Sequence, residues 1–523
     1  MKKNKGFVIT AVVLLLVNLL VAYLLLPTIS IHNVGLWFII LLDVIILTVR
    51  YHVFAVQSLK NIKTTAWLNV GLVLAIVIGS LVSSQMFNAS AYSNLLDISI
   101  SDKAELPGAD KLKKIPLMDT ESSKVLGNRK IGALNEIVSQ FEVSDDYMTI
   151  AYRNEPVKVS ALKYAGLWKW NANKKNGIPG YVMVKPNDLT AEYIELKEGM
   201  KYVPSAFFGQ DLYRHIYFRY PTVFFDNVHF EITEEGKPVY VASTYDYTIG
   251  LFGGKKINGC IVIDPVTGDM DRYDLNNIPQ WVDIVYNGNH IARYFDIYGK
   301  LINGFWNSWF GQKGLIESTT TTIYNSDGEA VRENDFGYIV DNNDVIVYTG
   351  VTAVTNDESN IGYLMANERT GEVRVSYFES TDEDSVMRAA EGEVQEKGYR
   401  ASFPSLIDIN GKPAYVMVLK DKLGLVKMYA IVDAAQYSHM IVADSLDKAL
   451  MQFTNGNITG ESLQEKTIVI KRVAIIGSGE TVVYIVDTDN NIYNSSFQPQ
   501  MLLLEEGQEI TILTDGAVFR LKD

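Results

Sequence analysis

Side chains that could perform chemistry are sparse in this chain, and none is spaced as a common catalytic frame. No two of the six histidines are arranged as His-Glu-x-x-His, the spacing that holds zinc in metallohydrolases. Cys260 is the only cysteine, which excludes internal disulfides and a cysteine-cluster metal site. There is no Gly-x-Ser-x-Gly, and no Ser-x-x-Lys with its partner motifs. We therefore expect a protein that is not an enzyme, with no catalytic residue, no metal site and no cofactor.

Two polar side chains stand inside otherwise apolar segments and form a first candidate pair. Asn18 lies eight residues before the outer end of the first segment, and Asp43 lies eight residues after the start of the second, so their depths match. A carboxylate inside a membrane is costly and usually faces a partner or water. We predict that Asn18 and Asp43 share a hydrogen bond that holds two helices together. A proton- or ion-coupled role is the alternative.

An aromatic stretch over residues 291–310 is the second candidate. Its large side chains recur at helical spacing, which predicts a helix with one aromatic face. Burial of that face against a sheet is one interpretation. The other is a surface for a membrane interface or a partner protein, because Trp and Tyr favour such places. The residues of that candidate surface are Tyr298, Phe305, Trp306, Trp309 and Phe310.

Three apolar segments must position the first pair. Residues 6–26, 35–54 and 66–84 each approach or exceed the roughly 20 helical residues that cross a bilayer core. Lysine and arginine precede the first segment and lie between the second and third, whereas the loop between the first and second has none. The positive-inside rule then places the N-terminus in the cytoplasm and the C-terminal domain outside. We predict a multi-pass plasma-membrane protein with the lipid bilayer as a partner.

The two parts of the chain differ in the sign of their charge. Residues 1–84 carry six Lys or Arg and one Asp, so the net charge of −14 for the whole chain leaves −19 for the remainder. Such an acidic domain should repel nucleic acid and anionic headgroups, so no nucleic-acid partner is expected. An exported domain without disulfides fits a Gram-positive envelope better than an animal extracellular space.

Turn and strand signals divide the remaining chain into modules. Three phrases, at residues 177–184, 236–243 and 411–418, place a Gly-x-Pro turn before an apolar run led by Tyr and Val. Glycine permits positive φ in the turn, and Tyr and Val suit a half-buried strand. Helical stripes accompany these strands, which indicates α+β layers. The stripes lie at 132–141, 205–220 and 384–397.

Five parts are expected along the chain. They are a three-helix transmembrane region over 1–87, a linker over 88–114, α+β regions over 115–280 and 281–445, and a small OB-like β-barrel over 446–523. The last part is inferred from short strands separated by tight turns. Its acidic charge and outside location argue against nucleic acid as its ligand.

Two of these modules resemble a known domain type. The segment 384–431, a helix followed by three strands, resembles a PepSY-type domain, and 205–273 resembles a more decorated copy. The phrases Ile115-Pro-Leu-Met-Asp-Thr-Glu-Ser122 and Gly304-Phe-Trp-Asn-Ser-Trp-Phe-Gly-Gln-Lys313 resemble a family of Gram-positive membrane proteins of unknown function, some labelled CvpA. The PepSY resemblance implies protein interaction or peptidase modulation at the envelope, without chemistry of its own.

The leading hypothesis is a noncatalytic envelope protein whose α+β modules bind a partner protein or peptide while the helices hold them at the outer face. The alternative is a subunit or adaptor of a membrane export or transport assembly that uses the helices and Asp43. A third hypothesis is an uncharacterised hydrolase.

Overall fold

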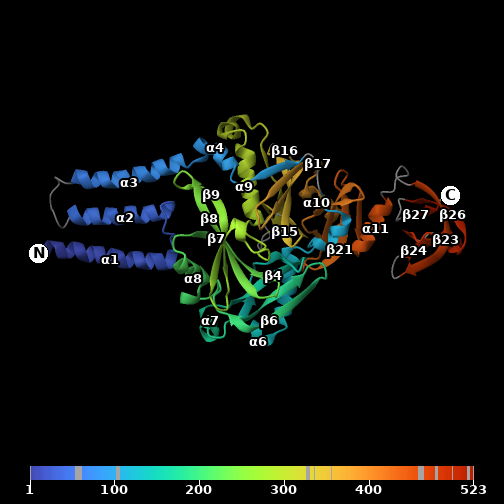
Figure 1. The fold of residues 1–523 in the computed structure, drawn as a ribbon, viewed down its shortest axis with the longest axis horizontal. Helices are drawn as coiled ribbons and strands as arrows, with labels where there is room; N and C mark the ends of the chain where they lie inside the picture. The colour runs from blue at the N-terminus through green and yellow to red at the C-terminus, as the bar shows by residue number, and fades with distance from the viewer. Residues whose placement is uncertain are drawn as a thin grey trace.

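The computed structural model describes residues 2–52, 62–101, 106–324, 330–334, 336–354, 356–456, 464–477, 481–496, 499–514 and 519–521. Three helices project side by side from one end of a β-rich body, and a small sheet with the C-terminus lies at the opposite end (Figure 1). The body between them is a mixed α/β structure with several antiparallel sheets.

The projecting helices are α1 (Lys2–Leu25), α2 (Val34–Arg50) and α3 (Ile62–Val82), and a bend of 45° follows α3 before α4 (Gln85–Ser93). Residues Val8–Leu25 are long and apolar enough to cross a membrane, and none of them is buried. The bent pair of α3 and α4 brings the number of candidate spans to two at most. The described part of α2 has 17 residues. The described residues of all three predicted segments are therefore mainly helical, and the crossing of a membrane by three helices stays a prediction.

A close junction joins α3 to the turn between two long strands, β8 (Pro238–Ile249) and β9 (Gly253–Ile263). Ser83, directly after α3, accepts the backbone N–H groups of Leu251 and Phe252 at 2.8 and 2.9 Å. Gly253 has no room for a side chain, because an added Cβ would meet Ser83 O at 2.4 Å. The turn is therefore fixed against the end of the helix by hydrogen bonds to the Ser83 hydroxyl and by close backbone packing at Gly253.

The end of α1 is held by the body in the same way. Arg214 Nε donates to Tyr23 O at 3.2 Å, and the Tyr217 hydroxyl donates to Pro27 O at 3.1 Å. Both donors lie on α8 (Leu212–Arg219), which Figure 1 shows beside the inner end of α1. The end of α1 thus contacts α8, and the end of α3 contacts the turn between β8 and β9.

Two antiparallel sheets share one core in the first half of the body. One has the order β2-β4-β5-β6, with β3 also paired to β4, and the other has the order β10-β9-β8-β7. Tyr181 of the first sheet and Phe230 of the second pack in that core with Ile216 of α8. The remaining elements here are β2 (Phe141–Val143), β3 (Met148–Tyr152), β4 (Glu155–Tyr164), β5 (Ile178–Lys185), β6 (Thr190–Met200), β7 (Phe224–Ile232), β10 (Met270–Asp274), α5 (Thr120–Gly132), α6 (Asn135–Val138), α7 (Leu167–Asn173), η3 (Phe208–Gln210) and η4 (Leu275–Asn277).

A third sheet packs on the other face of β8 and β9, with the order β1-β17-β16-β15-β11 and β14 also paired to β15. Val241 of β8, Phe295 of α9 and Val375 of β17 lie in one core. The predicted regions 115–280 and 281–445 therefore contribute side chains to the same core, on both sides of the predicted boundary at 280 and 281. The elements are β1 (Ile98–Ser101), α9 (Gly288–Leu301), η5 (Asn307–Gly311), β11 (Ile316–Ser318), β14 (Gly337–Asp341), β15 (Asp344–Ala353), β16 (Asn356–Asn367) and β17 (Val373–Thr381), with a separate hairpin of β12 (Thr320–Tyr324) and β13 (Ala330–Asn334).

The fourth sheet has the order β18-β20-β21-β22, with β19 paired to β20, and helices pack against it. Val386 of α10 and Phe453 of α11 are buried in its core. The elements are α10 (Glu383–Glu393), η6 (Gln395–Lys397), β18 (Arg400–Ala401), β19 (Ser405–Ile409), β20 (Lys412–Lys420), β21 (Val426–Asp433), β22 (Met440–Ala443) and α11 (Leu446–Gly456). The helix-then-strands order predicted for 384–431 is present.

The C-terminal sheet is antiparallel, with the order β25-β24-β23-β26-β27. Its longest strand, β23 (Gln464–Gly477), pairs with β26 through its first part and with β24 through its second part. Ile470, Tyr493 and Phe519 form a small core of their own. The other elements are β24 (Thr481–Asp487), β25 (Ile492–Ser496), η7 (Pro499–Leu503), β26 (Glu509–Thr514) and β27 (Phe519–Leu521).

The three Gly-x-Pro predictions are confirmed. Gly177, Gly236 and Gly411 have φ of +80°, +78° and +80°, a region that glycine adopts without strain, and β5, β8 and β20 follow them. Two helical predictions are wrong in part. Residues 132–141 hold the end of α5, the short α6 and the first residue of β2, and in 205–220 the α-helix starts at Leu212, where Asp211 caps it.

The linker prediction for residues 88–114 also needs correction. This segment contains the end of α4, the strand β1 and the 3₁₀ helix η2 (Ala109–Lys114). β1 pairs in parallel with β17, 275 residues further along the chain at Ile98↔Val373. A partner so distant leaves no periodic signal in a short polar segment, which is why the sequence suggested a linker.

Candidate binding cleft

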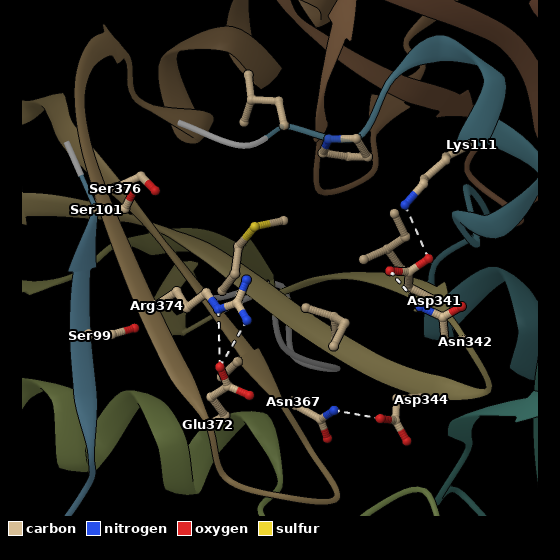
Figure 2. Close-up of a pocket in the computed structure, with 16 residues that line it drawn as sticks. Ser99, Ser101, Lys111, Asp341, Asn342, Asp344, Asn367, Glu372, Arg374 and Ser376 are labelled. Carbon is tan, nitrogen blue, oxygen red and sulfur yellow. Dashed lines mark hydrogen bonds and ion pairs between the residues drawn. The ribbon is translucent and has the colours of Figure 1, made fainter. Parts of the chain in front are cut away.

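A cleft of about 600 Å³ lies on one face of the third sheet (Figure 2). Side chains two residues apart point to the same face of a strand, and the floor consists of such pairs from five strands. The pairs are Ser99 and Ser101 of β1, Arg374 and Ser376 of β17, Met365 and Asn367 of β16, Asp344 and Ile346 of β15, and Ile339 and Asp341 of β14. Intervening residues, such as Val340, Val345 and Val375, are buried on the other face.

The wall opposite this floor comes from η2 and the residues just before it. Leu106, Pro107 and Lys111 line the cleft from that side. Pro107 O accepts the backbone N–H of Asp408 at 2.8 Å, which ties the segment to β19 of the neighbouring sheet. Lys111 Nζ lies 3.1 Å from Asp341 Oδ1, as Figure 2 shows. The wall is thus fastened both to the fourth sheet and to the floor.

The charged side chains of the cleft have partners of opposite sign. Arg374 pairs with Glu372 at 2.9 Å, but both side chains are about 60% exposed, where an ion pair is worth little. Asp344 instead receives both Nε and Nη2 of Arg369, at 2.7 and 2.9 Å, in a half-buried bidentate pair. The charged side chains that line the cleft are each paired with an opposite charge. The surface of the cleft therefore suits a neutral ligand with both apolar and polar groups.

The described lining of the cleft shows no nucleophile paired with a base. No histidine or cysteine is among its described lining residues. Ser99 Oγ donates to the backbone carbonyl of Val373 at 3.0 Å, so its proton does not face a base. Among all described residues, no cluster of three His, Cys, Asp or Glu could hold a metal ion.

The strand β1 forms the edge of the floor. The sheet order ends at β1, and the described residues place no strand beyond it. Ile100 is 54% exposed, an unusual position for a large apolar side chain in a sheet. Backbone N–H and C=O groups on an open edge are free to pair with another extended segment.

The predicted pair Asn18 and Asp43 is brought together. Asn18 Nδ2 donates to Asp43 Oδ2 at 2.5 Å, which links α1 to α2. A second polar contact, Asn69 Nδ2 to Thr48 Oγ1 at 3.3 Å, links α3 to α2. Contacts of this kind hold neighbouring apolar helices in register.

The aromatic stretch is divided between core and surface. The helix α9 ends at Leu301, Gly304 has φ of +87°, and the π-helical turn η5 follows, so no single helix covers 291–310. Ile291, Tyr294 and Phe295 are buried.

The predicted surface residues lie at or after the end of α9. Trp306, Trp309 and Phe310 are 56%, 68% and 80% exposed, while Tyr298 and Phe305 are half-buried. The Trp306 and Phe310 rings stack at 5.8 Å, and Phe305 packs on Trp306 and Trp309. Burial is therefore confirmed for the first half of the stretch, and a membrane or partner surface in the exposed second half stays a prediction.

A buried acidic cluster, not predicted from the sequence, is formed by Glu231, Asp283 and Glu368. Glu231 accepts the backbone N–H groups of Asp283 and Ile284, both at 3.0 Å, and lies 2.7 Å from His229 Nε2. Burial raises the pKa of Glu368 to about 8, and burial with the Glu231 charge raises the pKa of Asp283. The signal in the sequence was a lone carboxylate inside an apolar run, as in Phe230-Glu231-Ile232.

Comparison with known proteins adds little to this geometry. No protein-family model matches the chain, and no curated protein matches it. A variant of B. subtilis levansucrase covers 78% of this chain and 93% of its own at 9% identity, with a TM-score of 0.18. A variant of B. megaterium levansucrase covers 72% and 82% at 10% identity with a TM-score of 0.17, and an ACO/RPE65 chimera has a TM-score of 0.15 at 9% identity and covers 57% and 60%. Likeness at this level decides neither fold nor activity.

Proposed function

We propose that this chain is a noncatalytic envelope protein that is anchored in the plasma membrane by three helices and binds an extended partner peptide or protein segment in the cleft of its third sheet. The observation that carries the proposal is the cleft itself. Its floor combines polar and apolar side chains, its charges are balanced, and an open edge strand borders it. An added strand would pair with β1 and extend the sheet, and its alternate side chains would lie on the cleft side, beside this floor.

The anchoring is supported by the exposed apolar surface of all three helices. No residue of α2 is buried, and large apolar side chains such as Leu25 and Trp67 are more than 70% exposed. A continuous apolar surface of this kind is unfavourable in water and favourable in the hydrocarbon core of a bilayer. The contacts of Tyr23 and Pro27 with α8 favour an anchor over a cleaved signal sequence, because cleavage would remove part of the body's own packing.

The outside location of the body rests on the lysine and arginine residues that flank the helices. Cys260 is fully buried and is the only cysteine, so a cysteine introduced at exposed Lys397 gives one labelling site. In intact cells a membrane-impermeant maleimide should label Lys397→Cys without permeabilisation. Labelling that requires permeabilisation would contradict the proposed orientation.

The C-terminal sheet fits the OB-like prediction in strand order. In a five-stranded OB barrel the first strand pairs with the second and the fourth, and the third strand meets the fifth. Here β23 pairs with β24 and β26, and β25 lies near β27 without a ladder between their described residues. We include an OB-like barrel with one open seam in the proposal, as a further module for partner contacts.

The test of peptide binding uses a photo-crosslinking amino acid at Ser99, an exposed residue of β1 whose side chain lines the cleft, in the full chain in its native membrane. A discrete adduct is expected, and it should be lost when Met365→Gln is added to the cleft floor. The matched control is Val138→Gln on α6, which is exposed and lies outside the cleft. An adduct that survives Met365→Gln, or the same adduct from a crosslinker at Lys397, overturns peptide binding in the cleft.

The export or transport alternative makes a different prediction. The polar group inside the helices, Asp43, already accepts a hydrogen bond from Asn18, which suits helix packing. We therefore expect Asp43→Asn to leave the crosslinked adduct and the physiological function unchanged. Loss of function with an intact fold would favour the transport assembly.

A further inference from the structure

A second, smaller pocket of about 280 Å³ lies between β7, β9 and the start of α9. It is lined by two cations, Lys255 and Arg293, and by one carboxylate, Asp226. The domain around it is strongly acidic, so an excess of positive charge in one cavity is unusual for this chain. The sequence analysis expected the acidic domain to repel anions, and this pocket is a local exception.

The charge of Arg293 is not neutralised by the protein. Arg293 is exposed and forms no ion pair with any residue in the described part of the chain. Lys255 contacts Asp226, which is itself 41% exposed. Despite that contact, burial and then the Arg293 guanidinium lower the pKa of Lys255 to about 8. Burial, Lys255 and Arg293 lower the pKa of His290 to about 3, so its ring is neutral at pH 7. The pocket therefore has a positive field with room for a negative group.

The floor of the pocket is a fixed row of hydrogen bonds. Asn287 Nδ2 donates to Asn227 Oδ1 at 2.6 Å, and Ser243 Oγ donates to Val285 O at 2.8 Å. Asn227 adopts φ of +48° at a bulge in β7, which turns its side chain out of the regular strand pattern. Cationic donors above a rigid polar floor are a suitable arrangement for phosphate oxygens.

The pocket also lies close to the helices. Lys255 follows Gly253 by two residues along β9, which is about 7 Å at the usual rise of a strand. Gly253 contacts Ser83 at the end of α3. Each headgroup layer of a bilayer is roughly 5 to 8 Å deep. If α3 crosses the membrane as proposed above, Lys255 lies at the depth of lipid phosphates.

We propose that this pocket binds a phosphate group, carried either by a phospholipid headgroup or by a soluble phosphorylated molecule. Arg293 and Lys255 contact the phosphate oxygens, and the neutral His290 lines the side of the pocket. Only the lipid source rests on the proposed membrane topology, because phosphate binding itself requires nothing but the pocket.

The test uses the full-length protein in two arms. In detergent, inorganic phosphate is titrated by calorimetry at constant ionic strength, with chloride as the competing anion. In mixed micelles, native mass spectrometry counts bound phosphatidate against phosphatidylcholine. Saturable binding is expected in at least one arm. Binding of phosphatidate alone assigns the lipid source, and binding of inorganic phosphate assigns a pocket open to soluble ligands.

Three variants locate the site. Arg293→Gln and Lys255→Gln should each weaken binding at least tenfold. Lys256→Gln is the matched control, because Lys256 is the next residue, is exposed, and points to the opposite face of β9; its effect should stay below twofold. Thermal unfolding of each variant checks that the fold is kept. Absence of saturable binding in both arms, or an equal loss in Lys256→Gln, overturns the proposal whatever the orientation experiment shows.

Discussion

Two charged regions lie next to each other along the segment 283–293, and they differ in how their charge is accommodated. At one end, Asp283 joins Glu231 and Glu368 in a cluster that is almost completely buried. At the other end, Arg293 joins Lys255 at a pocket open to solvent. A ligand cannot reach the buried acidic cluster, whereas it can enter the basic pocket.

The difference follows from the cost of burying a charge. A carboxylate removed from water is stabilised only by close donors, and otherwise the group takes up a proton. Asp283 Oδ1 and Glu368 Oε2 have no hydrogen-bond partner in the described structure, and the pKa values of both residues are raised. Exposed Arg293 keeps its charge and can use it for binding. Buried charge here serves the fold, and exposed charge is available for function.

The largest expected effect comes from Glu368→Gln, which tests the buried side of this comparison. Glu368 has a pKa of about 8 in the folded chain, while an unfolded glutamate titrates near 4.5. The folded state thus holds an extra proton between these values, so stability falls as pH rises from about 4.5 to 8 and then levels off. At 1.36 kcal/mol per pH unit the loss approaches roughly 5 kcal/mol.

Glu368→Gln mimics the protonated form and keeps an acceptor for the Gly288 backbone N–H. The variant should therefore unfold at a higher temperature than the parent above pH 7 and show a flatter dependence on pH. Thermal unfolding from pH 5 to 9 measures both. A variant that is less stable than the parent at pH 8.5 would show that the cluster is not protonated in the fold.

A smaller effect is expected at the junction that places the basic pocket near the helices. In Gly253→Ala the new Cβ would meet the Tyr92 hydroxyl at 2.3 Å and Ser83 O at 2.4 Å. Overpacking of this kind costs about 1 to 3 kcal/mol. Faster amide exchange is expected at Leu251 and Phe252, with unchanged exchange in β20. Gly209→Ala is a matched control, since neither glycine has a positive φ and nothing lies within 4 Å of a Cβ added to Gly209.

The cleft contains one half-buried and one exposed ion pair. Removal of a charge there should lower the stability of the fold by an intermediate amount. Asp344→Asn breaks the half-buried bidentate pair with Arg369, and a loss of about 1 to 2 kcal/mol is expected. Glu372→Gln breaks the exposed pair with Arg374 and should cost less than about 0.5 kcal/mol. Denaturant unfolding of the two variants compares them. Equal losses would mean that exposure does not govern these pairs.

The smallest effect concerns the pH dependence of the basic pocket. Because the pKa of Lys255 is about 8, the pocket loses a positive charge as pH rises through that value. Affinity for a phosphodiester, whose own charge is constant in this range, should fall several-fold between pH 7 and 9. Lys255→Arg should abolish this dependence, because arginine stays charged. A parent affinity that is constant with pH would exclude Lys255 from the contact.

Local features of the chain were predictable because they depend on neighbouring residues. The apolar segments became helices in their described residues, Gly177, Gly236 and Gly411 took positive φ before strands, and the helix-then-strands order of 384–431 formed. The hydrogen bond of Asn18 with Asp43 also followed from sequence, since depth in a helix is set by counting residues. Helix starts were less predictable, as at Leu212, because a single cap residue decides them.

The sites were decided by the tertiary structure. The cleft needs β1 beside β17, and the acidic cluster needs Glu231, Asp283 and Glu368 in one core, although these residues are far apart in the chain. Whether an aspartate is paired, protonated or open to a ligand depends on the segments around it. Hydrophobicity and backbone preference are properties of short segments, and they fix where helices and strands form. Burial and charge pairing are properties of the assembled fold, and they determine which polar residues are free to bind.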